Sequence, residues 1–404
     1  MPSPSESSSP RAQLLPPGWA GSRLLPSAAA LKPATTSGTS FMISNRVDTD
    51  ATWAHYINPL PGGQMNWFLS TAQSNDPTRS DYIQQGSSST TPPDSFATAI
   101  AAALTSQTGP NPQLTVFIHG LGNLFSDAIW GMSSMGADLA TFANYPGLVI
   151  GFDWPSYGEG ESVLYYATNA TDKQYYFPPT ATSGSIRDNI NGSTQAFTNL
   201  VAFLEGLRTT INGLTISLIC HSEGNYMALL GTLGNSTQYF EHVLLLAADI
   251  NNAALQVPSA DPLVGQGYGI AQSGGDVTVY FTENDDVLPF SLAHWEYDYH
   301  NPEFGSRLGS AGPLYNAGQQ PANLYSVDCS GVINVQNFQY LQSLKIIPTI
   351  TDGSALSMHT SYLFIPQIVQ DMAALLTGAG PANIANRVPT GNPRAYYMAL
   401  NNNN

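Results

Sequence analysis

The chain has 404 residues, of which 42% are hydrophobic and 10% are charged, and it contains 29 Pro and 36 Gly. This composition fits a loop-rich globular protein better than a disordered one, which would carry more charge and fewer aromatic residues. The formal net charge is −16, and only 12 residues are Lys or Arg. Nucleic-acid binding needs clustered basic side chains, so we expect no nucleic-acid partner and a neutral substrate.

Composition also divides the chain into segments. Residues 1–40 are rich in Pro, Ser and Ala, which predicts a flexible tail, and apolar runs begin at Phe41. We expect one catalytic domain over residues 41–385 and a C-terminal tail over residues 386–404. The length alone does not distinguish one large domain from two average ones.

Signals for targeting are sparse. No run approaches the roughly 18 apolar residues of a transmembrane helix, and the first residues lack the basic start and apolar core of a standard signal peptide. The N-x-S/T sequons at Asn169, Asn191 and Asn235 and the scarcity of Lys favour secretion over a cytoplasmic location. The sequence does not indicate an oligomeric state.

The two cysteines, Cys220 and Cys329, are too few for a disulfide framework. Cys220 falls at the end of an expected central strand, where a small, reduced, buried residue suits the packing. Several expected strands separate it from Cys329, and a disulfide has a short reach. We therefore predict that no bridge joins them.

Apolar runs alternate with helical stretches along the chain. Two opening strands are expected at Phe41–Ile43 and Trp67–Leu69, followed by a capped helix that begins at Asp94. Six almost wholly apolar runs predict strands that are buried on both faces: Leu114–Ile118, Leu148–Phe152, Thr215–Ile219, Val243–Ala247, Val277–Phe281 and Asn323–Val327. Helices are expected between them at Leu124–Phe142, Ser193–Leu207 and Glu223–Leu233. This alternation is typical of an α/β fold with a mostly parallel, doubly wound sheet.

Two long stretches interrupt that alternation, residues 155–190 and 287–321. Both are rich in Tyr, Trp, Phe, Gly and Pro, and both follow strand ends on the side where such sheets bind ligands. Long loops in a compact domain are often lids or binding loops, although they can also be surface insertions whose aromatic residues pack locally. We expect pocket residues here, among them Tyr157, Tyr165 and Trp295.

The strongest motif surrounds Ser222, in Cys220-His221-Ser222-Glu223-Gly224. An apolar strand leads directly into this turn, and a helix-forming segment follows it. A nucleophile elbow requires small residues two positions before and after the Ser, because the backbone turns sharply. Gly224 meets that demand, and Cys220 stands where Gly is usual. The alternative is that Ser222 only caps the helix, but this strand-turn-helix context favours a nucleophile.

A His-Gly turn follows the strand at Leu114–Ile118. Such a turn points a backbone N–H into the site, so we expect the N–H groups of Leu121 and Glu223 to form an oxyanion hole. His119 itself is expected to be a structural residue of the turn and not a base.

A carboxylate that orients a catalytic imidazole belongs after the second strand beyond the elbow. Asp285 fits this position best, whereas Asp286 is expected to cap the next turn. Asp249, after the preceding strand, is an outside alternative, and Asp328 comes too late in the chain.

The base should be a His that follows the acid in the order Ser, Asp, His. By position and elimination this is His359, since His294 and His300 fall inside the aromatic insertion. His221 adjoins the nucleophile, but its side chain should point away from Ser222 across the tight turn.

Seven motifs occur in order: "FMISNR", "HGLGN", "DWPS", "CHSEGN", "NDDVL", "SRLG" and "MHTSYL". Together they resemble an uncharacterised branch of the α/β-hydrolase superfamily with esterase- and lipase-like members, over roughly residues 41–375. Members of that branch usually carry Met or Leu where this chain has Glu223. An acidic residue there would repel anionic substrates. The resemblance implies a serine-hydrolase fold and triad and specifies no substrate.

The leading hypothesis is hydrolysis of carboxylic esters through an acyl-enzyme on Ser222, with no metal and no organic cofactor. Acyl transfer or amide hydrolysis would use the same triad. A function of a different class is that of a binding protein, which would have the hydrolase scaffold but no catalytic activity. An Asp nucleophile, as in dehalogenases and epoxide hydrolases, is excluded by Ser222.

Overall fold

The structure is a computed structural model in which the following residues are described: 39–47, 59–71, 78–107, 111–120, 123, 125–156, 186–234, 236–260, 264–289, 306–315, 319–343 and 358–399. Residues 1–38 of the expected tail and most of both aromatic insertions lie outside these ranges, whereas Ser40, expected to be the last tail residue, is the first residue of a strand.

One sheet runs through the described part of the chain, with its eleven strands in the order β10-β11-β9-β8-β7-β6-β4-β5-β1-β2-β3. Neighbours from β11 to β1 pair in parallel, whereas β1–β2, β2–β3 and β10–β11 are antiparallel. The strands are β1 (Ser40–Ser44), β2 (Met65–Ser70), β3 (Ile83–Ser88), β4 (Gln113–Ile118), β5 (Leu148–Asp153), β6 (Thr215–His221), β7 (Phe240–Leu246), β8 (Gly274–Phe281), β9 (Leu324–Asp328), β10 (Arg387–Pro389) and β11 (Ala395–Met398).

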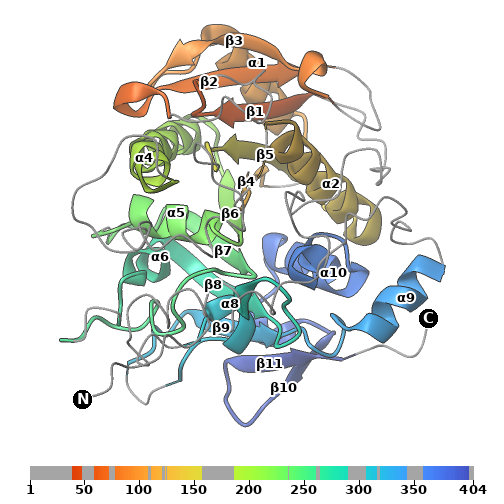
Figure 1. Ribbon diagram of the computed structural model, residues 1–404. Coiled ribbons are helices and arrows are strands. Elements are labelled where there is room, and N and C mark those ends of the chain that lie inside the picture. The colour runs from red at the N-terminus through yellow and green to blue at the C-terminus, as the bar shows by residue number, and fades with distance from the viewer. Residues whose placement is uncertain are drawn as a thin grey trace, which may run out of the picture.

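Helices cover both faces of this sheet (Figure 1). The α-helices are α1 (Asp94–Thr105), α2 (Phe125–Ala143), α4 (Ile186–Thr210), α5 (Gly224–Gly231), α6 (Tyr268–Ser273), α8 (Leu308–Ala311), α9 (Val335–Ser343) and α10 (Pro366–Leu376). The 3-10 helices are η3 (Pro61–Gly63), η4 (Arg79–Asp81), η6 (Met358–Leu363) and η7 (Pro381–Asn383). The prediction of a mostly parallel, doubly wound sheet is confirmed.

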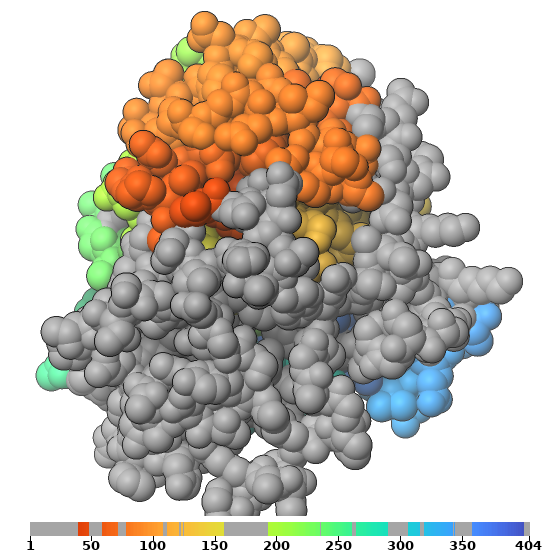
Figure 2. All heavy atoms as spheres, turned by 45° about the horizontal axis from the view of Figure 1, so that its top comes forward, coloured from red at the N-terminus to blue at the C-terminus, as the bar shows by residue number. Residues whose placement is uncertain are grey.

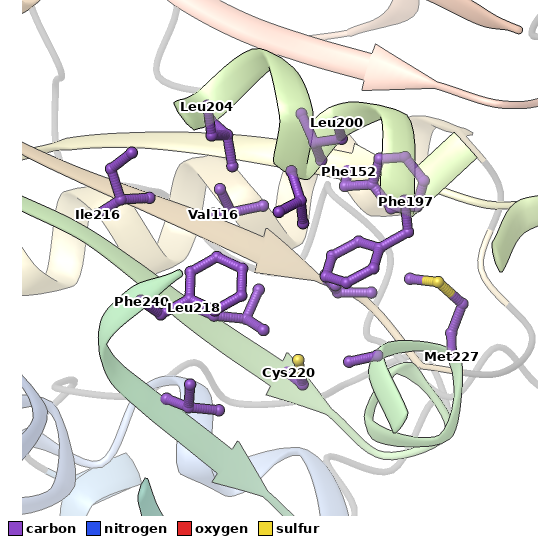
Figure 3. Close-up of a cluster of buried hydrophobic side chains, with 14 of the residues drawn as sticks. Val116, Phe152, Phe197, Leu200, Leu204, Ile216, Leu218, Cys220, Met227 and Phe240 are labelled. Atoms are coloured by element: carbon purple, nitrogen blue, oxygen red, sulfur yellow. The ribbon is translucent and has the colours of Figure 1, made fainter. Parts of the chain in front are cut away.

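The apolar strands contribute side chains to two hydrophobic clusters, one on each face of the sheet. Alternate side chains of one strand point to opposite faces, so Val116 and Ile118 of β4 join the cluster under α1, α4, α5 and α6, while Phe117 joins the cluster under α2 and α10. Figure 3 shows the first cluster, where Phe197 and Leu200 of α4 lie against the strands. All six predicted central strands overlap strands of the structure.

The sheet extends beyond β5 through the hairpin-like β1, β2 and β3. In Figure 2 the orange residues, which include β2 and β3, form the outer surface at this end of the molecule. The sequence analysis did not foresee β3, whose IQQGSS sequence has neither an apolar run nor a clear alternation. Helix α1 begins at Asp94, as expected, but its N-cap is Pro93, and Asp94 lies inside the first turn without a capping hydrogen bond.

The C-terminal segment differs from the tail that was expected over residues 386–404. Strands β10 and β11 lie within it and extend the sheet at β9. Arg387 is buried and bonds Asp371 of α10 through two nitrogens, at 2.9 and 2.8 Å. The prediction of a tail was wrong because Asn, Pro and Gly around these short strands are typical of loops. The strands are stabilised by pairing with β9 and by the ion pair between Arg387 and Asp371 of α10, which a local sequence pattern does not reveal.

Both cysteines are free and buried. Cys220 lies in the cluster under α4 and α5, and Cys329 lies in the cluster on the other side of the sheet. The predicted absence of a bridge is therefore confirmed. Among the described residues, no helix has the length and apolar character needed to cross a membrane.

Candidate active site

Ser222 stands at a strained turn between β6 and α5. Its φ is 55°, a left-handed conformation that is uncommon for residues other than glycine. The Ser222 N–H donates to the Leu246 carbonyl at 3.0 Å. The Asn225 amide donates to the carbonyls of Ser222 at 2.8 Å, Leu246 at 3.2 Å and Cys220 at 3.3 Å. These bonds hold the turn in a conformation that the chain alone would not favour.

Small residues around the elbow are required by close contacts. A Cβ at Gly224 would lie only 2.5 Å from the His119 carbonyl oxygen and 2.9 Å from that of Ile118. On the other side of Ser222, the Cys220 side chain points into the apolar layer with Leu218 and Met227 (Figure 3). Burial raises the pKa of the Cys220 thiol, so the thiol stays protonated and inert.

The His-Gly turn after β4 passes directly over the elbow. A Cβ at Gly120 would lie 2.6 Å from Cβ of Ser222 and 3.2 Å from its Oγ. The ring of His119 is engaged at both nitrogens, with Gly120 O at 2.8 Å and Asp153 Oδ1 at 3.0 Å. His119 is thus a residue of the turn, as the sequence indicated.

Asp285 and His359 meet in the structure, although 73 residues separate them in sequence. His359 Nδ1 lies 2.8 Å from Asp285 Oδ2, and both side chains are fully buried. The other carboxylate oxygen, Oδ1, accepts the N–H groups of Val287 at 2.9 Å and Leu288 at 2.8 Å. The loop after β8 therefore fixes the orientation of the acid, and the acid fixes the imidazole.

The other acidic candidates occupy different positions. Asp286 accepts the backbone N–H of His359 at 3.2 Å, and the carboxylate that caps the described part of the following turn is Asp285. Asp249 pairs with Arg307 Nε at 2.5 Å. Asp328 accepts the N–H of Ser330 at 2.8 Å. Among these four carboxylates, the one whose oxygen contacts the His359 ring is Asp285.

The contacts of His359 define its tautomer. Since Nδ1 faces a carboxylate, Nδ1 carries the proton and Nε2 keeps a lone pair. Nε2 is buried and has no hydrogen-bond partner among the described residues. Burial alone would lower the pKa of His359, but the carboxylates of Asp285, Asp286 and Asp249 outweigh it and raise the pKa above its usual value.

His221, next to Ser222, supports the same histidine. Its Nε2 lies 3.0 Å from the carbonyl oxygen of His359, and the two rings are 5.0 Å apart at 56°. Burial lowers the pKa of His221 to about 3, so the ring is neutral. A carbonyl only accepts hydrogen bonds, so Nε2 is the protonated nitrogen. The sequence reasoning placed His221 away from the nucleophile but did not foresee this contact or that of Asn225.

The remaining predicted site residues are only partly described. Glu223 is 1% exposed and directly precedes α5, so an acidic residue is buried beside Ser222. Leu121, Tyr157, Tyr165 and Trp295 lie outside the described residues. Among the residues that are described, no three His, Cys, Asp or Glu side chains are arranged to hold a metal ion.

Residues 93–345 match the family described as alpha/beta hydrolase of unknown function (DUF900). The chain belongs to this family. The parallel sheet with its elbow at Ser222 is accordingly the α/β-hydrolase fold, which confirms the resemblance seen in the motifs. Membership in this family establishes the hydrolase scaffold and leaves the reaction and substrate to be inferred from the site.

Three solved structures resemble this chain at low sequence identity. TT1662 from Thermus thermophilus is 20% identical, with a TM-score of 0.30 over 56% of this chain and 82% of that one. Atu2452 of unknown function from Agrobacterium tumefaciens is 12% identical, with a TM-score of 0.26 over 58% and 91%. The Francisella virulence factor BioJ is 11% identical, with a TM-score of 0.29 over 59% and 76%. No curated protein matches the chain significantly in sequence.

Proposed function

We propose that this α/β-hydrolase cleaves carboxylic esters through an acyl-enzyme on Ser222. The observation that carries the proposal is the Asp285–His359 contact of 2.8 Å, which leaves a buried Nε2 uncommitted at the edge of the sheet where the elbow lies. A base needs a free lone pair and a fixed orientation, and this arrangement supplies both.

The chemistry follows from the residues. Ser222 Oγ attacks the ester carbonyl carbon while His359 Nε2 takes the hydroxyl proton. Asp285 keeps the imidazole in one tautomer and stabilises it when it becomes charged. The N–H groups of Leu121 and Glu223 are the proposed donors to the oxyanion. His359 returns the proton to the leaving alcohol, and water, deprotonated by the same nitrogen, then releases the acid.

The substrate class is proposed from charge. The chain carries a formal charge of −16, and a buried glutamate follows the nucleophile directly. The net negative charge repels anions, so a neutral ester fits better than one bearing a free carboxylate. Tyr157, Tyr165 and Trp295 remain the proposed pocket residues and favour apolar or aromatic acyl or aryl groups.

The test is turnover of a chain-length series of p-nitrophenyl esters by the wild type and Ser222→Ala. We expect the substitution to lower kcat by about 10⁴-fold or more. The matched control is Ser217→Ala, which should stay active, because Ser217 is a buried serine of β6, the strand that leads into the turn at Ser222. Full activity of Ser222→Ala would contradict the proposal.

Two further measurements separate the alternatives. Product analysis with added alcohols distinguishes hydrolysis from acyl transfer, because both pass through the same acyl-enzyme. A fluorophosphonate probe should label the folded wild type at Ser222. Failure to label would favour a binding protein on a hydrolase scaffold.

A further inference from the structure

A buried charge cluster lies beneath the His-Gly turn, and the proposed reaction does not use it directly. It consists of Arg46, which follows β1, His119, which follows β4, and Asp153, which ends β5. Arg46 is 2% exposed, His119 1% and Asp153 0%. Three motifs noted in the sequence, "FMISNR", "HGLGN" and "DWPS", therefore converge on one point.

The Arg46 guanidinium contacts both carboxylate oxygens of Asp153. Its Nε lies 2.9 Å from Oδ1 and 2.8 Å from Oδ2, and Nη2 lies 2.8 Å from Oδ1. The Ser44 hydroxyl donates to Oδ2 at 2.5 Å. Burial alone would raise the pKa of Asp153, but Arg46 and His119 hold it below its usual range. The carboxylate stays charged although it is buried.

His119 connects this cluster to the start of the turn. Its Nε2 lies 3.0 Å from Asp153 Oδ1, and its Nδ1 donates to the Gly120 carbonyl at 2.8 Å. The indole of Trp154 stacks on the imidazole at 7° and donates to the His119 carbonyl at 2.9 Å. The backbone at His119 and Gly120 is thus held through the side chain and the carbonyl groups.

The far end of the turn is tied to the same cluster. Arg46 Nη2 donates to the Asn123 carbonyl at 2.6 Å. The Ser156 hydroxyl accepts the Asn123 N–H at 2.9 Å and donates to its carbonyl at 3.1 Å. Asn123 in turn donates from its amide to the Gly120 carbonyl at 2.9 Å. Both ends of the turn therefore depend on one buried ion pair.

We propose that Arg46, Asp153 and His119 are positioning residues for the reaction, which hold the His-Gly turn at a fixed distance above Ser222. The inference rests on the proposed function. A buried ion pair is weak evidence for stability, because removing charges from water offsets most of their attraction. The bonds to Gly120 and Asn123 give the cluster a different role. They fix the backbone of Gly120, where an added Cβ would lie 2.6 Å from Cβ of Ser222, and transition-state stabilisation depends on donors held in place beforehand.

The test uses Asp153→Asn, which keeps the shape of the side chain and removes its charge. With the ester substrates, we expect kcat to fall about 10- to 100-fold with KM within about 2-fold, since only transition-state contacts are lost. Thionoesters carry sulfur in place of the carbonyl oxygen and gain less from an oxyanion hole. The ratio of ester to thionoester turnover should therefore fall as well. Arg46→Lys should retain more activity than Arg46→Met.

The matched control is Asp371→Asn, because Asp371 forms an equally buried pair with Arg387, beside β8 and β10. This variant should lose stability without changing the ester-to-thionoester ratio. An equal effect of both Asp→Asn variants on the ratio, or no effect of Asp153→Asn, would overturn the inference. If Asp153→Asn does not fold, Ser156→Ala, which loses only the two bonds to Asn123, gives the same comparison.

Hydrogen exchange over residues 118–125 provides a readout that needs no turnover. Exchange should accelerate in Asp153→Asn and Ser156→Ala and stay unchanged in Asp371→Asn. Unchanged exchange in all three variants would overturn the inference. An inactive wild type would instead contradict the proposed function, so the two failures are distinguishable.

Discussion

The imidazole of His221 holds the backbone of His359, because its Nε2 lies 3.0 Å from the His359 carbonyl oxygen. The residue before the proposed nucleophile thus orients the segment that carries the proposed base. His221→Phe would keep a ring in the site and leave the buried carbonyl without its donor, at a cost of about 1–3 kcal/mol. We expect kcat/KM for esters to fall roughly 10-fold.

The control for that substitution is His242→Phe. His242 is also buried and lies on β7 near its amino end, away from the elbow. Steady-state kinetics of both variants should separate a local effect on His359 from a general effect of removing a buried imidazole. Equal losses in the two variants would contradict the role given to His221.

The pH dependence of activity should report the raised pKa of His359. The imidazole must be neutral to accept the Ser222 proton, so activity is lost as the pH falls through this pKa. The midpoint of the acidic limb of kcat/KM should therefore lie above the ordinary imidazole value of about 6.5. An acidic limb centred below 6 would contradict the surroundings described for His359.

The adjacent aspartates provide a matched pair. Asp285 bonds the His359 ring at 2.8 Å, whereas Asp286 accepts only its backbone N–H at 3.2 Å. Asp285→Asn should lower kcat by up to about 10⁴-fold, and it should move the acidic limb to lower pH because it removes the strongest charge that raises the pKa. Asp286→Asn should have a much smaller effect on both. The measurement is kcat and kcat/KM over a pH series. A larger loss of kcat in Asp286→Asn than in Asp285→Asn would show that Asp286 is the acid that acts on His359.

Gly224 tests the geometry of the elbow. In Gly224→Ala the new Cβ would lie 2.5 Å from the His119 carbonyl oxygen, a backbone atom that cannot move freely. We expect about 1–3 kcal/mol of lost stability and a steep loss of esterase activity. Gly206→Ala in α4 has no atom within 4 Å of its new Cβ and should be neutral or stabilising by about 0.5–1 kcal/mol. The two variants are compared by their Tm and by their ester turnover. Unchanged Tm and turnover in Gly224→Ala would contradict the close approach of Gly224 to the His119 carbonyl oxygen.

The C-terminal strands should be needed for stability. Arg387→Met leaves the buried Asp371 without its main partner, which costs about 3–5 kcal/mol in comparable pairs. Removal of residues 386–404 should be more damaging, because it also uncovers β9. Removal of residues 401–404 alone is the control. The measurement is the free energy of unfolding in denaturant for all three variants. If all three values equalled that of the wild type, residues 386–404 would be a dispensable tail.

The sequence alone determined the scaffold and the order of the candidate residues. Continuous apolar runs specify strands that are buried on both faces, and a strand-turn-helix with small residues around Ser222 specifies an elbow, because both are local patterns. The position of His359 after Asp285 followed from chain order. These features need no knowledge of distant contacts.

Only the tertiary structure decided which groups meet. Asp285 and Asp286 are adjacent in sequence, and the fold alone turns one toward the His359 ring and the other toward its backbone. The contacts of His221 and of Arg46 cross 138 and 107 residues, a separation at which no periodicity is informative. Strands β3 and β10 likewise form because a neighbouring strand or ion pair stabilises them, and their own sequences favour neither a strand nor a helix.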